Sequence, residues 1–249
     1  MRVVLLGATK GMGRALARHM AARGDDLYLL GRDADDLQRS ARDLEIRNGR
    51  ATGSIGTGVC DLAAPGGFAG ALESADRAFG DEGFDTVVVT GANFDVQDNL
   101  EEHPALTQQL LTVNFTGTIL FCEEARRRLL PRGRGTLCVF SSVAGERGRK
   151  PVILYGAAKA GLSHYLEGLD HKFRERGLKV VTVKPGFVRT GMTAGLPSPP
   201  FAGDPDAVAV QVRRAIVRGR PVVYAPPIWG LIMFVIRLLP RFVMRRIGF

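Results

Sequence analysis

Cysteine is scarce in this chain, and so are apolar runs long enough to span a membrane. The sequence has only three cysteines, Cys60, Cys122 and Cys138, which lie in or beside apolar segments and lack the spacing of a metal site. We interpret them as reduced core cysteines and expect no metal centre. The apolar stretch 228–236 is too short to cross a bilayer, which needs about 20 residues.

The chain also has no recognition motif for nucleic acid. Its net charge is +9, yet no run interleaves aromatic and basic residues in the manner of a nucleic-acid interface. We therefore expect another anionic partner, namely a phosphorylated substrate, NADP or an acidic membrane surface. No secretion signal is apparent, because the sequence starts with a strand-like apolar run, and this predicts a cytoplasmic location.

What the sequence does have is a regular alternation of strand and helix patterns. Its 249 residues, 45% hydrophobic and 24% charged, suit one large α/β domain. The alternation predicts a Rossmann-type, doubly wound parallel sheet in three layers, α/β/α. We expect strands at 3–6, 26–30, 52–59, 86–89, 136–140, 179–183 and 222–224, and helices at 14–22, 33–48, 68–79, 104–130, 153–176 and 208–217. This domain would span 1–225, with a mobile lid at 192–206, and an apolar, basic tail would follow at 226–249.

A glycine-rich turn follows the first strand. Gly7, Gly11 and Gly13 stand in the order G-x-x-x-G-x-G between the apolar run and a helix that starts near Arg14. A strand, a glycine turn and a helix start form a cradle for dinucleotide phosphates, because small residues let the pyrophosphate approach the backbone. The spacing differs from the commoner G-x-G-x-x-G fingerprint. An ordinary tight loop is the alternative interpretation.

A serine, a tyrosine and a lysine carry the strongest chemical signal. Tyr155 and Lys159 are four residues apart, so on a helix both side chains stand on one face. A free tyrosine has a pKa near 10, and a neighbouring cation should lower it. Ser142, thirteen positions before the tyrosine, could hold a substrate oxygen while Tyr155 moves the proton. Ser141 competes with Ser142 for this role, and an incidental surface pair is the alternative for the tyrosine and lysine.

Together these features resemble the classical short-chain dehydrogenase/reductase family. The resemblance rests on the glycine turn, on Asn114, on the serine, tyrosine and lysine, and on Lys-Pro-Gly-Phe-Val-Arg-Thr at 184–190, and it covers essentially the whole chain. It implies a nicotinamide cofactor. It also implies that Tyr155 is the general acid in reduction, that Lys159 lowers the tyrosine pKa and bonds the nicotinamide ribose, and that Ser142 polarises the carbonyl. Asn114 would help to relay protons through water.

The resemblance further implies a set of cofactor-binding residues. These are Gly7, Thr9, Lys10, Gly11, Met12, Gly13, Arg32, Asp61, Leu62, Gly91, Ala92, Tyr155, Lys159, Pro185, Gly186, Val188 and Thr190. Asp61 matches the family residue that bonds the adenine amino group, and a surface cap is its alternative role. The chain departs from the family pattern after the fourth strand, where Thr90-Gly91-Ala92 replaces Asn-Ala-Gly. The contribution of that asparagine to the strand framework is therefore missing.

The expected cofactor is NADP(H). Enzymes that prefer NAD usually have an acid at the end of the second strand, bonded to the ribose 2′-hydroxyl. Here that position is Gly31, Arg32 follows, and Lys10 lies in the glycine turn. Two cations suit a 2′-phosphate. Solvated surface charges are the alternative interpretation of both.

The tail and several short motifs resemble one branch of the family. Residues 141–147, Tyr155-Gly156, residues 188–192 and Tyr224-Ala-Pro before the tail resemble the decaprenylphosphoryl-2-keto-ribose reductases. The resemblance implies reduction of a keto-sugar carried on polyprenyl phosphate, a lipid-linked and amphipathic carbonyl substrate. A 3-ketosphinganine reductase, a generic soluble ketone reductase and a non-catalytic NADP-binding sensor are the alternatives.

The tail also bears on location and assembly. Its apolar residues, Trp229 and its arginines suit an interfacial helix on an anionic membrane, so the protein is expected in the cytoplasm with peripheral contact to the inner membrane surface. A core helix or an oligomer contact is the alternative. The long helices expected at 104–130 and 153–176 resemble those that join relatives into homodimers or homotetramers.

Overall fold

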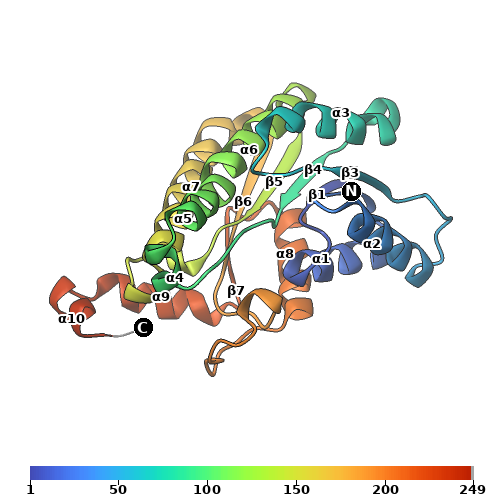
Figure 1. The fold of residues 1–249 in the computed structure, drawn as a ribbon. Coiled ribbons are helices and arrows are strands. Elements are labelled where there is room, and N and C mark those ends of the chain that lie inside the picture. Colours follow the sequence, from blue (N-terminus) through green and yellow to red (C-terminus); the bar gives the residue numbers. More distant parts are fainter. Residues whose placement is uncertain (248–249) are drawn as a thin grey trace.

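The computed structural model describes residues 1–247, so positions 248 and 249 of the predicted tail lie outside the described part. A seven-stranded parallel sheet forms the centre, in the order β3-β2-β1-β4-β5-β6-β7 (Figure 1). Its strands are β1 Arg2–Leu6, β2 Asp26–Gly31, β3 Gly56–Val59, β4 Thr86–Val89, β5 Gly135–Phe140, β6 Leu178–Pro185 and β7 Val222–Ala225. The strand order runs outward in both directions from β1 and β4. The carboxyl edge beside these two strands is therefore the switch point where such sheets bind ligands.

Helices cover both faces of the sheet, which confirms the predicted Rossmann-type, three-layer fold (Figure 1). One face packs against α1 Gly11–Ala22, α2 Ala34–Arg47 and α8 Pro205–Arg218. The other packs against α3 Phe68–Ala78, α6 Thr118–Leu129 and α7 Ile153–Phe173. Central strands are buried from both sides, and for this reason β4 is an unbroken apolar run after its first residue.

Shorter helical segments join these elements. Two α-helices, α4 Gln97–Glu102 and α5 Pro104–Leu111, precede the π-helix η3 Thr112–Gly117. The 3-10 turns are η1 Pro65–Gly67, η2 Gly80–Glu82, η4 Leu130–Arg132, η5 Val143–Gly145, η6 Lys150–Val152, η7 Arg174–Arg176 and η8 Gly191–Thr193. The predicted lid at 192–206 begins inside η8 and is joined to the body by a bridge between Val188 and Gly203. Its mobility stays a prediction.

Several predicted bounds shift by one to three residues, and two predicted elements differ more than that from the structure. The third strand begins at Gly56 instead of 52, since Gly53 adopts a positive φ of 81° that interrupts extended chain. The predicted helix 104–130 is not regular, because η3 interrupts it and carries Asn114. A side chain at Gly117 would collide with the carbonyl of Leu62, so a glycine is needed where this helix passes the cavity described below.

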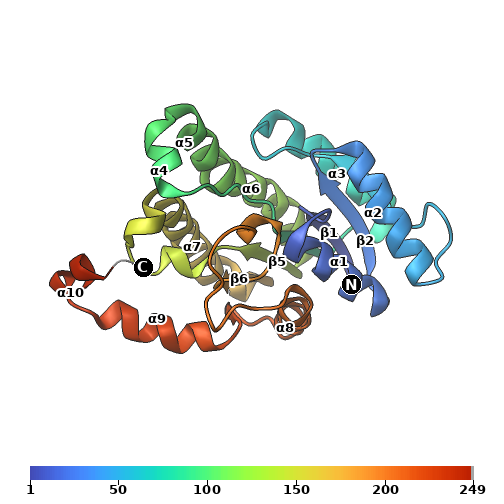
Figure 2. The same ribbon diagram turned by 60° about the horizontal axis from the view of Figure 1, so that its bottom comes forward.

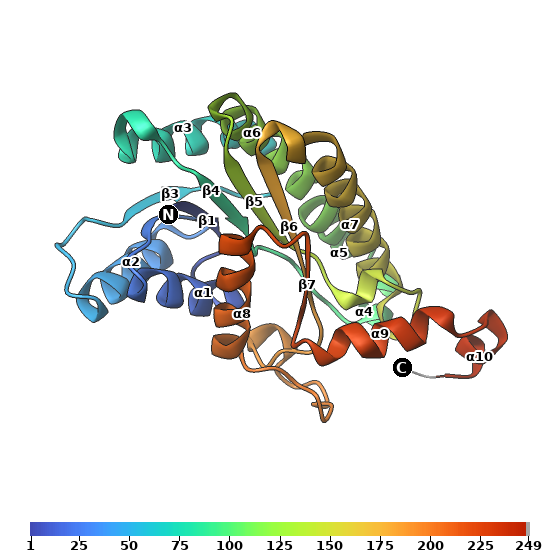
Figure 3. The same cartoon turned by 180° about the vertical axis from the view of Figure 1, so that it is seen from behind.

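The tail forms two short helices, α9 Ile228–Leu238 and α10 Arg241–Arg246, on the side of the molecule away from α1 and α2 (Figure 3). Trp229, Met233 and Ile236 of α9 pack against Val143, just after β5. Within residues 1–247, no helix has the length and apolar character needed to cross a bilayer. The proposed division of the chain at residue 225 stays a prediction.

Candidate active site

A cavity of about 310 Å³ opens at the carboxyl edge of β1, β2 and β4. Its lining includes every predicted cofactor residue from Gly7 to Ala92, together with Thr190. The residues that sequence reasoning missed are Leu6, Gly31, Cys60, Thr90, Asn93, Val113, Gly191 and Met192. The cavity lining does not include the remaining predicted cofactor residues, which are Tyr155, Lys159, Pro185, Gly186 and Val188.

The glycines of the first turn are required by close packing of the backbone. Gly7 has a φ of 95°, and a Cβ there would lie 2.6 Å from both the amide nitrogen of Gly91 and the Oγ1 of Thr90. A Cβ on Gly13 would collide with the carbonyl oxygen of Gly7. The turn is thereby packed against the residues that follow β4, and the amino end of α1 faces the cavity. Such a backbone cradle fits the phosphates of a dinucleotide.

Thr90 takes the place of the asparagine that the family pattern has after the fourth strand. Its hydroxyl lies 3.1 Å from the carbonyl oxygen of Leu6 and 3.0 Å from that of Gly7. The side chain therefore ties the end of β4 to the end of β1, at the point where the glycine turn begins. The threonine hydroxyl therefore links the two strands. From the sequence alone, this link was expected to be missing.

Basic side chains stand at the rim of the cavity, next to an acid. Lys10 is 81% exposed and its Nζ lies 3.6 Å from Oδ2 of Asp36. The other carboxylate oxygen, Oδ1, accepts a 2.6 Å hydrogen bond from Arg39. The bond from Arg39, with a smaller contribution from Lys10, lowers the pKa of Asp36. Arg32 is exposed as well. Asp36 was not anticipated, because an acid in the first turn of a helix is common without any ligand.

Asp61 makes the capping contact, and its predicted bond to the adenine amino group stays a prediction. Its Oδ1 accepts a 2.9 Å hydrogen bond from the amide of Ala63, which is the surface cap considered as an alternative. The same residue lines the cavity beside Leu62. Capping fixes the direction of the carboxylate, and its position leaves it available to the cavity.

Tyr155 and Lys159 lie on one face of α7, as their spacing predicts. The lysine Nζ is 5.7 Å from the centroid of the tyrosine ring. Phe94 packs edge-on against that ring, with 5.2 Å between the two ring centroids. Burial raises the pKa of Tyr155 to about 12, although the hydroxyl of Ser142 acts in the opposite direction. The net shift of this pKa is therefore upward, and the lowering by the Lys159 ammonium stays a prediction.

Lys159 lies deeper than the tyrosine. Its side chain is 1% exposed, and its Nζ donates a 3.0 Å hydrogen bond to the carbonyl of Phe140 at the end of β5. Burial lowers the pKa of this ammonium to about 8. The lysine therefore connects α7 to the strand that delivers the serine.

The two serines after β5 have separate partners. Ser141 is buried, and its Oγ donates to the carbonyl of Lys159 at 3.0 Å and lies 2.7 Å from the Oγ of Ser163, so it joins β5 to α7. Ser142 is only partly buried and its Oγ accepts a 3.1 Å hydrogen bond from the amide of Ala144. That bond leaves the Ser142 proton free to be donated. Ser141 is thus bonded within the core while Ser142 is not, and the role of Ser142 at the substrate oxygen stays a prediction.

Asn114 is fully buried, and its side-chain amide is bonded to one backbone segment. Oδ1 accepts from the amide of Asn93 at 2.8 Å, and Nδ2 donates to the carbonyl of the same residue at 2.6 Å. The side chain thus fixes the segment after β4, where Asn93 lines the cavity. Its part in a proton relay stays a prediction.

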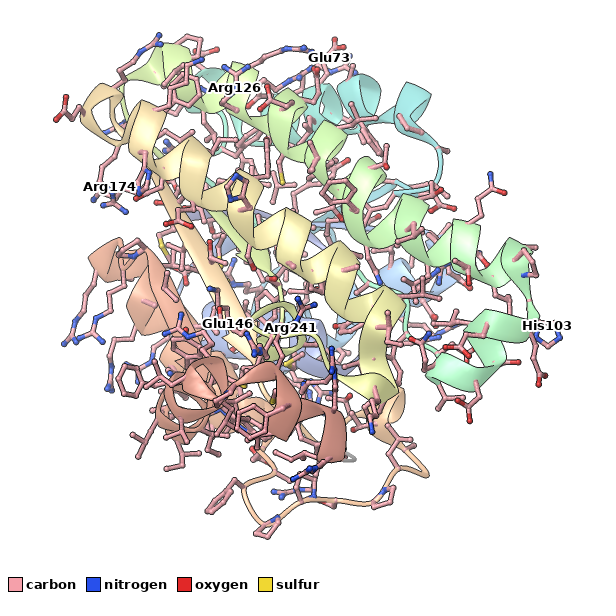
Figure 4. All side chains as sticks on the ribbon, turned by 90° about the vertical axis from the view of Figure 1, so that its left-hand side faces the viewer. Glu73, His103, Arg126, Glu146, Arg174 and Arg241 are labelled. Carbon is pink, nitrogen blue, oxygen red and sulfur yellow. The ribbon has the colours of Figure 1, made fainter. Side chains whose placement is uncertain are left out.

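Glu146 was not predicted. It connects the segment 141–147 after β5, called the serine loop here, to the tail. This carboxylate is 5% exposed and pairs with Lys184 of β6 and with Arg237 of α9, the latter at 3.2 Å. It also accepts a 3.2 Å bond from the hydroxyl of Tyr224. Figure 4 shows Glu146 beside the tail helices. A lone acid four residues after Ser142 gives no sequence signal of this role.

The second predicted group of cofactor residues begins with Pro185, the last residue of β6, and continues after the strand. Gly186 lies under Trp229, because a Cβ at this glycine would overlap the indole ring. Val188 is buried, and Thr190 caps η8 and lies next to Gly11, bringing this segment to the glycine turn. The tail therefore covers Gly186, while Thr190 borders the cavity.

Comparison with known proteins identifies the class. The family model for short chain dehydrogenases matches residues 1–199. An uncharacterized oxidoreductase from Mycobacterium tuberculosis is 35% identical over 246 residues, covering 98% of this chain and 96% of that protein. Carbonyl reductase family member 4 from Danio rerio is 32% identical over 193 residues, 78% of each chain.

A solved structure shares the fold over nearly the whole chain. The short-chain dehydrogenase from Sphingobium yanoikuyae in complex with NADPH has a TM-score of 0.79 and 22% sequence identity, covering 96% of each chain. The family model and the relatives show that this protein is an oxidoreductase that acts on CH–OH or C=O groups. The chain belongs to the short-chain dehydrogenase family, whose members use nicotinamide cofactors.

Proposed function

We propose that this protein is an NADPH-dependent reductase whose substrate is a carbonyl on a lipid-linked, amphipathic molecule, specifically a keto-sugar carried on polyprenyl phosphate. The observation that carries the reductase assignment is the convergence of Ser142 and Tyr155, with Lys159 below the tyrosine ring. The observation that favours NADPH is the pair of exposed cations, Lys10 and Arg32, on one cavity.

The chain's own residues then have defined tasks. NADPH, when bound by the glycine cradle and the residues after β6, supplies the hydride. Tyr155 donates its phenolic proton to the carbonyl oxygen, and its raised pKa keeps the phenol protonated at neutral pH. Ser142 donates a hydrogen bond to the same oxygen, and the Lys159 ammonium supports the tyrosine after the proton has left.

A lipid-linked substrate is supported by features of this chain alone. The tail helix α9 packs directly on the loop that follows Ser142, and the net charge of +9 suits a phosphate-bearing substrate. None of the relatives described above is named for such a substrate. We therefore place the protein in the cytoplasm, at the inner surface of the membrane where a polyprenyl phosphate resides. We propose a homodimer or homotetramer joined through α5, α6 and α7.

Turnover on matched substrates tests the reductase. NADPH oxidation should be followed with a polyprenylphosphoryl 2-keto-pentose and, in parallel, with 3-ketosphinganine. Turnover of the sugar lipid alone supports the proposal, while turnover of 3-ketosphinganine alone replaces it with a sphingolipid reductase. Tyr155→Phe should lose about 10²–10⁴-fold in rate while still binding NADPH. Tyr165→Phe is the matched control, because Tyr165 lies on the same helix with its hydroxyl on Glu123, 2.7 Å away. Wild-type turnover by Tyr155→Phe would contradict the proton-donor role of Tyr155, whereas NADPH binding without turnover of either substrate by the wild type would favour a non-catalytic, sensor-like use of the fold.

Cofactor choice needs its own binding measurement. Fluorescence titration should show that Lys10→Ala and Arg32→Ala each weaken NADPH binding about tenfold or more and leave NADH binding nearly unchanged. Arg42→Ala, an exposed arginine on α2, is the control. Equal losses for both nucleotides would contradict recognition of the 2′-phosphate.

A further inference from the structure

The tail presents an apolar face that the rest of the described chain leaves uncovered. Leu231 and Leu238 are 63% and 69% exposed, and Phe234 and Val235 between them are more than half exposed. Spacings of three, four and seven residues place these side chains on one side of α9. Phe242 of α10 is exposed as well. The opposite side of α9 is the one packed on the body of the protein.

The charge around this face has a single sign. Arg237, Arg241, Arg245 and Arg246 are all exposed, and the segment 226–249 contains no aspartate or glutamate. The arginines of α6 differ, because they alternate with Glu123 and Glu124 and pair with them. The tail has no such acids of its own; within residues 1–247, Glu146 pairs with Arg237, and Arg241, Arg245 and Arg246 form no ion pair.

We propose that this face, formed by Leu231, Phe234, Val235, Leu238 and Phe242 with the surrounding arginines, docks on the surface of an anionic lipid bilayer. Apolar residues enter the headgroup boundary while arginines contact acidic headgroups, as in interfacial helices. The eleven residues of α9 give a helix of about 16 Å, about half of the hydrocarbon core, so it lies on the bilayer.

A second copy of the chain fits this face less well. A two-fold contact would set the same patch of both copies face to face. Arginines of one tail would then meet those of the other, and no acid in the segment 226–249 could offset their repulsion. An anionic bilayer surface would bury the apolar residues and would also pair the arginines with acidic headgroups.

The docked face lies close to the candidate active site. The other side of α9 contacts Val143 and Glu146 of the serine loop and covers Gly186 through Trp229. The helix starts just after β7, at the carboxyl edge of the sheet, and runs past the start of α7 (Figure 2). Docking would hold this edge at the bilayer, where a lipid-borne carbonyl can reach it. Only this last step rests on the proposed reductase function.

Vesicle co-sedimentation of the full-length protein tests the inference without cofactor or substrate. We expect binding to phosphatidylcholine vesicles that contain phosphatidylglycerol, weaker binding to pure phosphatidylcholine, and loss of the difference in high salt. Leu231→Ser/Leu238→Ser should weaken binding roughly 100-fold, since two exposed leucines no longer enter the bilayer. Arg241→Gln/Arg245→Gln should weaken it roughly 30-fold on anionic vesicles only.

Ile46→Ser is the matched control, because Ile46 on α2 is 80% exposed and lies off the face. It should bind vesicles like the wild type. Three results would each overturn the proposal. The leucine variant could bind vesicles like the wild type, or the wild type could bind both vesicle types equally. Light scattering could also show a wild-type dimer that the leucine substitutions dissociate. Tyr155→Phe should bind vesicles normally, so a failure of the reductase assignment is distinguishable from a failure of docking.

Discussion

Replacing Lys159 with methionine should stabilise the protein at neutral pH while turnover is lost. The side chain is 1% exposed, and burial lowers the pKa of its ammonium from 10.5 to about 8. A folded-state pKa this much below the unfolded value removes about 3 kcal/mol from the free energy of unfolding at pH 7. Methionine avoids that cost but leaves the Phe140 carbonyl without its donor, at about 1 kcal/mol. The expected net gain is about 2 kcal/mol.

The pH dependence separates the buried charge from side-chain packing. Because the folded pKa is the lower one, the unfolded chain binds the proton more tightly. The penalty is therefore complete below pH 8 and fades as the pH rises towards 10.5. The advantage of Lys159→Met should shrink by about 2 kcal/mol between pH 7 and pH 10.

Urea unfolding of wild type and variant at pH 7, 8.5 and 10 measures this difference directly. Lys172→Met is the control, because it makes the same substitution at an exposed lysine of the same helix. A stability difference between Lys159→Met and wild type that stays constant across this range would refute the argument from the buried ammonium.

Three further changes have expected outcomes. Thr90→Val removes the hydroxyl that ties β4 to β1 and should lower the free energy of unfolding by about 1–2 kcal/mol in urea titrations; an unchanged midpoint would contradict this. Gly7→Ala should lower the free energy of unfolding by more than 1 kcal/mol and weaken NADPH binding in fluorescence titrations, since its φ is positive and Thr90 and Gly91 leave no room for a Cβ; wild-type affinity would rule out the tight-cradle argument. Glu146→Gln should cost about 2 kcal/mol and speed tryptic cleavage near Arg237, because the bonds from Lys184 and Arg237 lose their charged acceptor. An unaltered cleavage rate would show that the carboxylate does not hold the tail.

Features with a strong local pattern were predictable from the sequence. The run 86–89 is apolar after Thr86, and its assignment as a buried strand matches β4 residue for residue. The glycine turn was predictable because its spacing reflects a backbone constraint, which the crowding at Gly7 and Gly13 makes explicit. The placement of Tyr155 and Lys159 on one helix face follows from helical geometry alone.

Features set by distant contacts were not predictable. The irregular turn at Asn114 depends on Gly117 passing the Leu62 carbonyl, a contact between residues far apart in the chain. The pKa of Tyr155 depends on how much solvent it loses, which spacing does not report. Glu146 acquires its role from cations on β6 and α9. For the tail, composition indicated an amphipathic helix, but which side meets the body is decided by Val143.

The anchoring of the tail at Glu146 has a practical consequence for anyone who shortens the chain. Removing an apolar, basic terminus is a common way to obtain material that concentrates well. A version of this protein ending at residue 225 would lose Arg237 from the Glu146 carboxylate and would open Val143 to water. Kinetics or inhibitor screens on such a truncation would therefore describe a serine loop without its natural cover. Engineering of substrate preference would likewise have to treat the loop and the terminus as one unit.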